Sequence, residues 1–220
     1  QAIPTNEPVQ TTTEPEIESE PIDLPDPVLE SDMSLEAAIK RRRSIRDFKD
    51  TALPLKSVGQ ILWAAQGITE PVRGFRAVPS AGALYPLEVY LVAGRVEGLP
   101  AGVYRYLPAT HQLVLVTEGD RRSQVSAAAL SQQWVIDAPA SIFIAGVHAR
   151  TEAVYGNRAR IYVYMEAGHA GQNISLQAVS LGMGSVPIGA FHDREIAAAI
   201  GMPADESPLY LFPIGFPDTN

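Results

Sequence analysis

The sequence predicts one α+β domain with a central mixed sheet flanked by helices. Three observations lead to this prediction. Helical and strand-like patterns alternate irregularly and include one hairpin, residues 140–145 (ASIFIA) form a short run that is almost wholly apolar, and residues 158–181 form one long helical pattern. A short apolar run of this kind is typical of a central strand that is buried on both faces. The long helix is rich in Ala and Gly, and such a helix lies either inside the core or at a two-fold dimer interface.

Helices are expected where apolar residues recur at helical spacing. Ser34 is a suitable N-cap for a helix over 35–42, with Glu36 in its first turn and basic residues at its end. Residues 55–66 repeat apolar side chains every three or four positions, and Gly67 ends that pattern. The other expected helices are 121–133, 158–181 and 194–200, and the expected strands are 88–93, 104–107, 113–116, 140–145 and 209–214, with 187–191 a loop or short strand.

The charge of the chain is concentrated in its first residues. The 220 residues carry a formal net charge of −8, and residues 1–30 hold eight acidic residues and no Lys or Arg. Residues 31–220 therefore carry 17 acidic and 17 basic residues, and a neutral domain argues against a nucleic-acid binder. Residues 1–32 are interpreted as an acidic arm rich in Pro, Thr and Glu, and residues 33–220 as the domain.

The arm has two possible interpretations. It lacks the apolar content needed to offset backbone ordering, so it is either a solvated, extended tail or an arm laid along a partner subunit. In the second case Ile22, Leu24, Val28 and Leu29 are the expected anchors. The first residue is Gln, and a Thr/Pro/Glu-rich stretch often follows a removed export signal, so export is a hypothesis and no compartment is assigned.

Several kinds of site are excluded by their missing residues. The chain has no Cys, and its four His residues lie far apart without a carboxylate at ligand spacing, so no metal site is expected. No run reaches the roughly 20 apolar residues of a membrane-spanning helix. The glycines of 182–189 complete neither a dinucleotide-binding fingerprint nor a P-loop, and no serine lies in a nucleophile elbow.

Three segments carry residues suited to binding a ligand. Arg42 and Arg46 lie four residues apart with the hydroxyl of Ser44 between them, and arginine forks beside a hydroxyl suit a phosphate monoester. The alternative is a solvated, basic helix end. Residues 79–86 (PSAGALYP) form either a simple turn or a small-residue bend against which a planar ligand lies. Residues 187–191 (PIGAF) have the same character, and the N–H groups of Gly189 and Ala190 are candidate donors to a ring heteroatom.

Together these segments resemble the nitroreductase-like FMN oxidoreductases, specifically the SagB/ThcOx-type branch. The resemblance covers residues 34–217. It rests on six ordered motifs, namely 42–48 (RRSIRDF), 62–68 (LWAAQGI), 79–88 (PSAGALYPLE), 132–134 (QQW) with 138–139 (AP), 166–169 (EAGH) with 172–173 (QN), and 187–191 (PIGAF).

The resemblance implies a sandwich fold, a homodimer and two FMN molecules at its interface. It implies that Arg42, Arg43 and Ser44 meet the FMN phosphate and ribityl chain, and that Arg46 lies near the pyrimidine edge. It also implies that Pro79, Ser80, Ala81 and Gly82 pack on one face of the ring, that Gln132 reaches the flavin, and that the segment Pro187, Ile188, Gly189 and Ala190 offers backbone donors near N5 and O4.

The implied activity is transfer of hydride through flavin N5 between NADH, NADPH or an organic donor and a small organic acceptor. Two departures from the family's pattern matter. Residues 213–220 lack the basic residues that help to hold phosphate in typical nitroreductases, and Val154 precedes Tyr155 where azoline-forming members have lysine. A freestanding oxidoreductase is therefore favoured over a peptide-azoline oxidase, and a flavin-binding protein without catalysis is the alternative.

Overall fold

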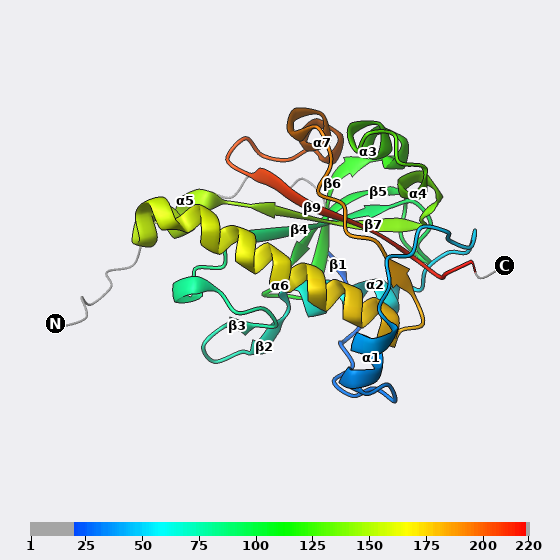
Figure 1. Cartoon of the computed structure of the whole chain (residues 1–220), viewed down its shortest axis with the longest axis horizontal. Coiled ribbons are helices and arrows are strands. Elements are labelled where there is room, and N and C mark those ends of the chain that lie inside the picture. The colour runs from blue at the N-terminus through cyan, green and yellow to red at the C-terminus, as the bar shows by residue number, and fades with distance from the viewer. Residues whose placement is uncertain (1–19, 219–220) are drawn as a thin grey trace.

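The computed structural model describes residues 20–218, and one seven-stranded sheet forms its centre (Figure 1). The strands lie in the order β1-β6-β5-β4-β7-β9-β8. Their bounds are β1 Ile22–Asp23, β4 Leu87–Ala93, β5 Gly102–Leu107, β6 Gln112–Glu118, β7 Ala140–Gly146, β8 Gly184–Ser185 and β9 Ser207–Gly215. A separate hairpin joins β2 (Ile68–Glu70) to β3 (Phe75–Arg76).

The prediction of a central sheet flanked by helices is confirmed, but the strand pairing differs from the expected mixed sheet. Every pair of named strands in the described chain is antiparallel. Among residues 20–218, parallel neighbours occur only in isolated bridges, such as Ser44 with Ser185. Helices follow several of the strands, yet these connections return the chain in the antiparallel direction, which alternation along the sequence does not reveal.

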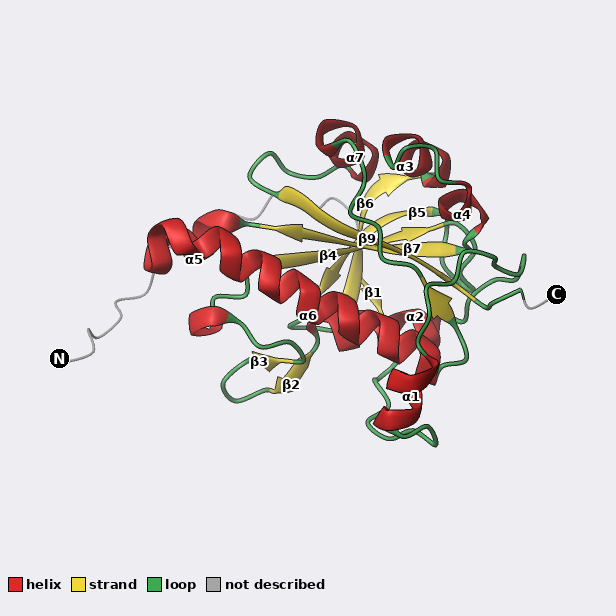
Figure 2. Ribbon diagram, in the orientation of Figure 1, coloured by secondary structure: helices red, strands yellow, loops and turns green. Residues whose placement is uncertain are grey.

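Helices cover both faces of the sheet, as Figure 2 shows. One layer contains α1 (Leu35–Arg41), α2 (Leu55–Gln66) and α6 (Ala159–Ser180). The other contains α3 (Arg122–Ala128), α4 (Gln133–Asp137) and α7 (Asp193–Ile200). The helix α5 (His148–Tyr155) and the single turns η1 (Ala81–Ala83) and η2 (Gly156–Arg158) complete the fold.

Strand β7 shows how the sheet joins these layers. All seven of its residues are buried, as expected for the apolar run 140–145. Ile142 and Ile144 face the core under α2 and α6, whereas Phe143 and Ala145 face the core under α3 and α7. The alternation follows from the period of two in a strand, so both helical layers pack on one central strand.

One expected helix is interrupted. The pattern over 121–133 predicts continuous helix, but α3 ends at Ala128, and Leu130 and Ser131 adopt left-handed backbone angles (φ 59° and 56°). The Ser126 hydroxyl donates to the carbonyl of Gln132 (2.9 Å) and closes this turn. The chain then begins α4 in a new direction, which sets the position of Gln132.

The described part of the arm lies on its own chain. Strand β1 adds to the edge of the sheet beside β6, and Leu24 is buried in the core. The side-chain amide of Gln60 on α2 bonds both backbone groups of Val28. Its Oε1 accepts from the N–H (2.7 Å) and its Nε2 donates to the carbonyl (3.0 Å). Residues 1–19 of the predicted arm lie outside the described residues, and the boundary at residue 32 stays a prediction.

Helix α6 packs closely on the sheet at Gly171. A Cβ atom at this position would lie 2.5 Å from Cζ of the buried Phe212 on β9. We expect Gly171→Ala to lower the free energy of unfolding by about 1–2 kcal/mol, because steric overlap outweighs the better helix propensity of Ala. Urea denaturation measures the change. If the overlap is the cause, Phe212→Leu lowers the free energy of unfolding less in the Gly171→Ala variant than in the wild type. An equal decrease in both proteins contradicts this explanation.

Candidate functional site

The segment carrying Arg42 and Arg46 is positioned by α1 and by strand β8. Ser34 caps α1 as predicted, since its Oγ accepts the N–H of Ala37 (3.2 Å). After Arg42 the chain becomes extended and runs along β8, where the N–H of Ile45 donates to the carbonyl of Ser185 (3.0 Å). This approach requires Gly184, because a Cβ atom there would lie 2.5 Å from Cγ1 of Ile45.

Three arginines on this segment have no carboxylate partner within the described residues. Arg42 makes no side-chain hydrogen bond or ion pair there, and Arg43 donates only to the carbonyls of Lys40 (3.1 Å) and Arg42 (2.7 Å). Arg46 lies over the ring of Trp134, with its Cζ atom 5.4 Å from the ring centroid. Uncompensated guanidinium groups so close in sequence favour a bound anion.

Gln132 and the loop 187–190 lie beside this cationic segment. The Nε2 of Gln132 donates to the carbonyl of Ala129 (2.8 Å) and approaches that of Ala190 (3.4 Å). Ile188 is buried and exchanges backbone hydrogen bonds with Leu211. Gly189 and Ala190 are exposed, and within the part of the chain that the structure describes their N–H groups have no acceptor.

These residues form what we call the arginine half-site. Its members are Arg42, Arg43, Ser44, Arg46, Gln132, Pro187, Ile188, Gly189 and Ala190. Trp134, which the sequence analysis quoted only as part of a motif, belongs beside it. The Nε1 of Trp134 is buried without a hydrogen-bond acceptor among the described residues, so a donor is left for a ligand group or a water.

The bend at 79–82 leads into strained backbone and is fixed from several sides. Gly82, Ala83 and Tyr85 all have positive φ angles (63°, 54° and 46°), which only glycine adopts readily. The N–H of Tyr85 donates to the hydroxyl of Ser80 (2.9 Å). The tyrosine of α5 borders the bend, since a Cβ atom on Gly82 would lie 3.0 Å from Oη of Tyr155. We call Pro79, Ser80, Ala81 and Gly82 the bend half-site.

A buried carboxylate anchors the bend to α6. The N–H of Ala81 donates to Oε1 of Glu166 (2.9 Å), and Glu166 is only 4% exposed. Burial raises the pKa of Glu166, although hydrogen bonds from Ala81 and Ser80 and the nearby His169 act in the opposite direction. The role of Glu166 could not be predicted, because nothing in the spacing of 166–169 indicates which loop the helix will meet.

The two half-sites lie at opposite parts of α6 in one chain. The bend is tied to Glu166, whereas the segment leading into α1 is tied to the far end of the helix by a hydrogen bond between the hydroxyls of Ser31 and Ser180 (2.8 Å). Fourteen residues separate these anchors, which corresponds to about 21 Å of helix. Figure 1 shows η1 and α1 near opposite ends of α6. The bend and the segment leading into α1 therefore contact different parts of α6, and the prediction that Arg42 and 79–82 meet one ligand stays a prediction.

Two negative findings hold for residues 20–218. The described residues contain no group of three His, Asp or Glu side chains that could hold a metal ion. No helix among them is long and apolar enough to cross a bilayer.

The chain is an α+β sandwich that carries a cationic segment and a small-residue bend. Comparison with known proteins identifies the family to which it belongs. The model of the nitroreductase family matches residues 39–216. A curated protein of Methanocaldococcus jannaschii, named "Putative nitroreductase", is 42% identical over 194 residues, which cover 88% of this chain and 95% of that protein. This chain belongs to the nitroreductase family.

Three further similarities extend the comparison. A solved structure from Ralstonia eutropha, described as a "putative nitroreductase", has a TM-score of 0.80 and 29% identity, and the match covers 92% of this chain and 91% of that one. The indigoidine synthase of Streptomyces lavendulae is 34% identical over 117 residues, which is 51% of this chain and only 8% of the synthase. The structure of the Escherichia coli microcin synthetase complex shares the fold, with a TM-score of 0.72 at 23% identity.

The Glu166 anchor predicts a contrast between two substitutions. Glu166→Ala leaves the N–H of Ala81 without its acceptor and should lower the free energy of unfolding by about 1–3 kcal/mol. Glu166→Gln retains the acceptor oxygen without the charge. Because the pKa of Glu166 is raised on folding, the wild type loses stability as pH rises from about 4.5 through the folded-state value.

We therefore expect Glu166→Gln to gain stability relative to the wild type as pH rises through this window. Urea denaturation from pH 4 to pH 8 measures the difference. A constant difference between the two proteins over this range would show that Glu166 does not titrate as the buried geometry requires.

Proposed function

We propose that the protein is an FMN-dependent oxidoreductase of the nitroreductase type, in the SagB/ThcOx-type branch. The observation that carries the proposal is the arginine half-site. Within residues 20–218, it combines three guanidinium groups without carboxylate partners, two unpaired backbone N–H groups and one buried indole N–H without an acceptor. These donors suit a ligand that has a phosphate at one end and a polar heterocycle at the other.

Each half-site suits a different part of FMN. Arg42, Arg43 and Ser44 would hold the phosphate and the ribityl chain, and Arg46 would lie near the pyrimidine edge. The unpaired N–H groups of Gly189 and Ala190 suit the polar edge of the ring. The bend half-site offers small side chains and close backbone to one flat face.

The chemistry is that of the cofactor. When bound, FMN supplies hydride transfer at its N5 atom, with NADH, NADPH or an organic molecule as donor and a small organic molecule as acceptor. The chain's own residues bind and orient the flavin, and the cations stabilise negative charge on its ring. We assign no side chain a role as obligatory acid or base.

A homodimer would bring complementary half-sites together. The outer face of α6 exposes Ile161 (42%), Tyr164 (46%) and Met165 (54%), and a Cβ atom on Gly168 would meet nothing within 4 Å. Gly168 lies near the middle of the 22-residue helix. A two-fold axis there would place the bend half-site of one copy beside the arginine half-site of the other, because antiparallel packing opposes the two ends of α6. This arrangement gives two equivalent FMN sites.

A groove beside α6 supports the same arrangement. Met33, Leu35, Trp63 and Leu176 line a surface hollow between α1, α2 and α6. Leu35 is 62% exposed in the single chain, and Ile39 on the same helix is 54% exposed. Apolar surface of this extent next to the candidate site is typical of a homodimer interface.

The first test removes one phosphate contact. Arg42→Ala should weaken FMN binding by roughly 10- to 100-fold, which corresponds to one charge-assisted hydrogen-bonding group. Quenching of flavin fluorescence measures the dissociation constant. Arg194→Ala, which removes an exposed arginine of α7, is the matched control and should leave the affinity unchanged. Equal affinities in both variants would remove Arg42 from the site.

If bound FMN is not reduced by NADH or NADPH and transfers nothing to any acceptor tested, the non-catalytic alternative is correct.

The second test concerns the α6 interface. Gly168→Glu adds a charge that the single chain accommodates but that a helix–helix contact would bury unpaired. The dissociation constant of the dimer should therefore rise by at least roughly 100-fold. Analytical ultracentrifugation measures the mass, and flavin absorbance measures bound FMN. We expect both to fall together, with Ala198→Glu on exposed α7 as the control. A wild type that is monomeric yet binds FMN would contradict the shared site.

A further inference from the structure

Helix α4 is too short to hold its own position. Its five residues, Gln133–Asp137, leave most of their backbone carbonyls without an intrahelical donor. No side chain caps its N-terminus. An isolated helix of this length does not persist in water, so its geometry depends on groups outside it.

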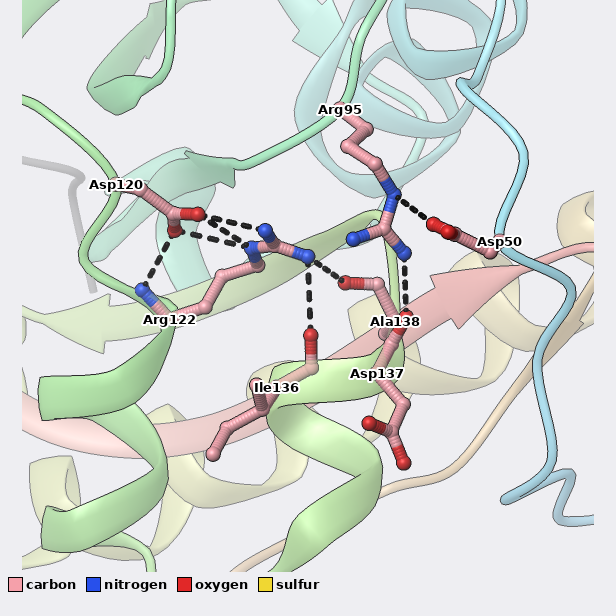
Figure 3. A network of polar contacts seen from close by, with 7 residues as sticks. All are labelled: Asp50, Arg95, Asp120, Arg122, Ile136, Asp137 and Ala138. Carbon is pink, nitrogen blue, oxygen red and sulfur yellow. Dashed lines mark hydrogen bonds and ion pairs between the residues drawn. The ribbon is translucent and has the colours of Figure 1, made fainter.

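Two arginines from other elements bind the carbonyl end of α4 (Figure 3). The Nη1 of Arg122 donates to the carbonyls of Ile136 (2.9 Å) and Ala138 (3.1 Å). The Nη2 of Arg95 donates to the carbonyl of Asp137 (2.7 Å). Three successive carbonyls at the C-terminus of the helix thus receive cationic donors, the arrangement that the helix dipole favours.

The Arg122 guanidinium is itself held rigidly. Its Nη2 and Nε bond to Oδ2 and Oδ1 of Asp120 (2.6 Å and 2.9 Å), and its own backbone N–H donates to Oδ1 (3.1 Å). Its side chain is only 11% exposed. The neighbouring Gly94 allows this path, because a Cβ atom there would lie 2.0 Å from Nε of Arg122. The hydrogen bonds from Arg122 also lower the pKa of Asp120, so the pair stays ionised at neutral pH.

The other end of α4 reaches the candidate site. Gln132 is the residue that precedes the helix, and its side chain approaches the carbonyl of Ala190 in the arginine half-site. Trp134, in the first turn of α4, packs under Arg46. A displacement of α4 along its axis or a rotation about it would therefore move both side chains relative to the half-site.

We propose that Arg122, held by Asp120, is a positioning residue that sets α4 in place and thereby orients Gln132 toward the cofactor. The inference rests on the proposed function, because Gln132 matters to the site only if FMN binds there. Arg95 contributes less, since its ion pair with Asp50 (3.0 Å) involves a carboxylate that is 87% exposed.

A double-mutant cycle on FMN affinity tests the proposal. Gln132→Ala in the wild type should raise the dissociation constant by roughly 5- to 10-fold, the effect of one hydrogen-bonding group. Arg122→Gln should raise it by a similar factor. In the Arg122→Gln background, Gln132→Ala should then change the constant by less than about 2-fold, because Gln132 has already lost its orientation. The absorption band of bound flavin should shift in the same way in both single variants.

The control is the adjacent arginine. Among the described residues, Arg121 makes one side-chain hydrogen bond, to the carbonyl of Glu118 (3.2 Å), and none to α4, so Arg121→Gln should leave both affinity and spectrum unchanged. If Arg122→Gln fails to fold, Asp120→Asn replaces it, since this change keeps the arginine but loosens its fork. We then expect the effect of Gln132→Ala to shrink by at least about half.

The outcomes separate two failures. Effects of Arg122→Gln and Gln132→Ala that multiply independently would assign Arg122 a general stabilising role and overturn the inference, while the proposed function stands. A wild type that binds no FMN would overturn the proposed function itself.

Discussion

The packing of α6 across the sheet is the constraint on which the candidate site depends. Ala167, Ala170, Ile174 and Ala178 bury one face of this helix in the core, and Gly171 lets it lie against Phe212. The helix therefore acts as a rigid spacer. It holds the bend half-site through Glu166, and Ser180, which bonds Ser31 before α1, lies about 21 Å further along the helix. For this reason the proposed FMN site takes one half-site from each of two copies of the chain.

Local departures from stable structure gather at the two half-sites. Three residues of the bend region have left-handed backbone angles, and three arginines lie together without carboxylate partners in the described chain. Each feature costs free energy in the folded protein, and sequences retain such costs chiefly where function requires them. Other charges of the described chain are paired, as in the network of Arg105, Glu88 and Glu206, where the Arg105 Nη2 lies 2.9 Å and 3.3 Å from the two carboxylates.

Local patterns predicted the elements well and their relations poorly. The helix over 55–66 has the predicted bounds because its apolar period and Gly67 are local signals. The break between α3 and α4 was missed because Leu130 and Ser131, rather than glycine or proline, adopt the left-handed angles. Helix α5 and the hairpin of β2 and β3 were missed as well. The antiparallel pairing arises from contacts between distant residues, which no periodicity encodes.

In the candidate site, too, local motifs were predicted and the contacts between distant residues were not. Motifs indicated Arg42, Gln132 and Gly189, and the structure brings their segments together through the Ser44–Ser185 bridge, the stacking of Arg46 on Trp134 and the approach of Gln132 to Ala190. The order of motifs along the chain could not show that residues 79–82 lie at the other part of α6. Nor could it show Glu166 and Arg122, whose partners are backbone groups of remote loops.

A mixed dimer tests the shared site most directly. One copy would carry Arg42→Ala and the other Gly82→Val, which the positive φ angle and the nearby Tyr155 hydroxyl disfavour, and each copy would carry a different affinity tag. Bound FMN is then measured by absorbance in the two homodimers and in the purified mixed dimer. If each site combines the arginine half-site of one copy with the bend of the other, the mixed dimer retains one intact site. It then binds one FMN at a flavin concentration at which the weakened sites of both homodimers stay largely empty. A mixed dimer without FMN would contradict the account, because a site built within one chain is damaged in both copies.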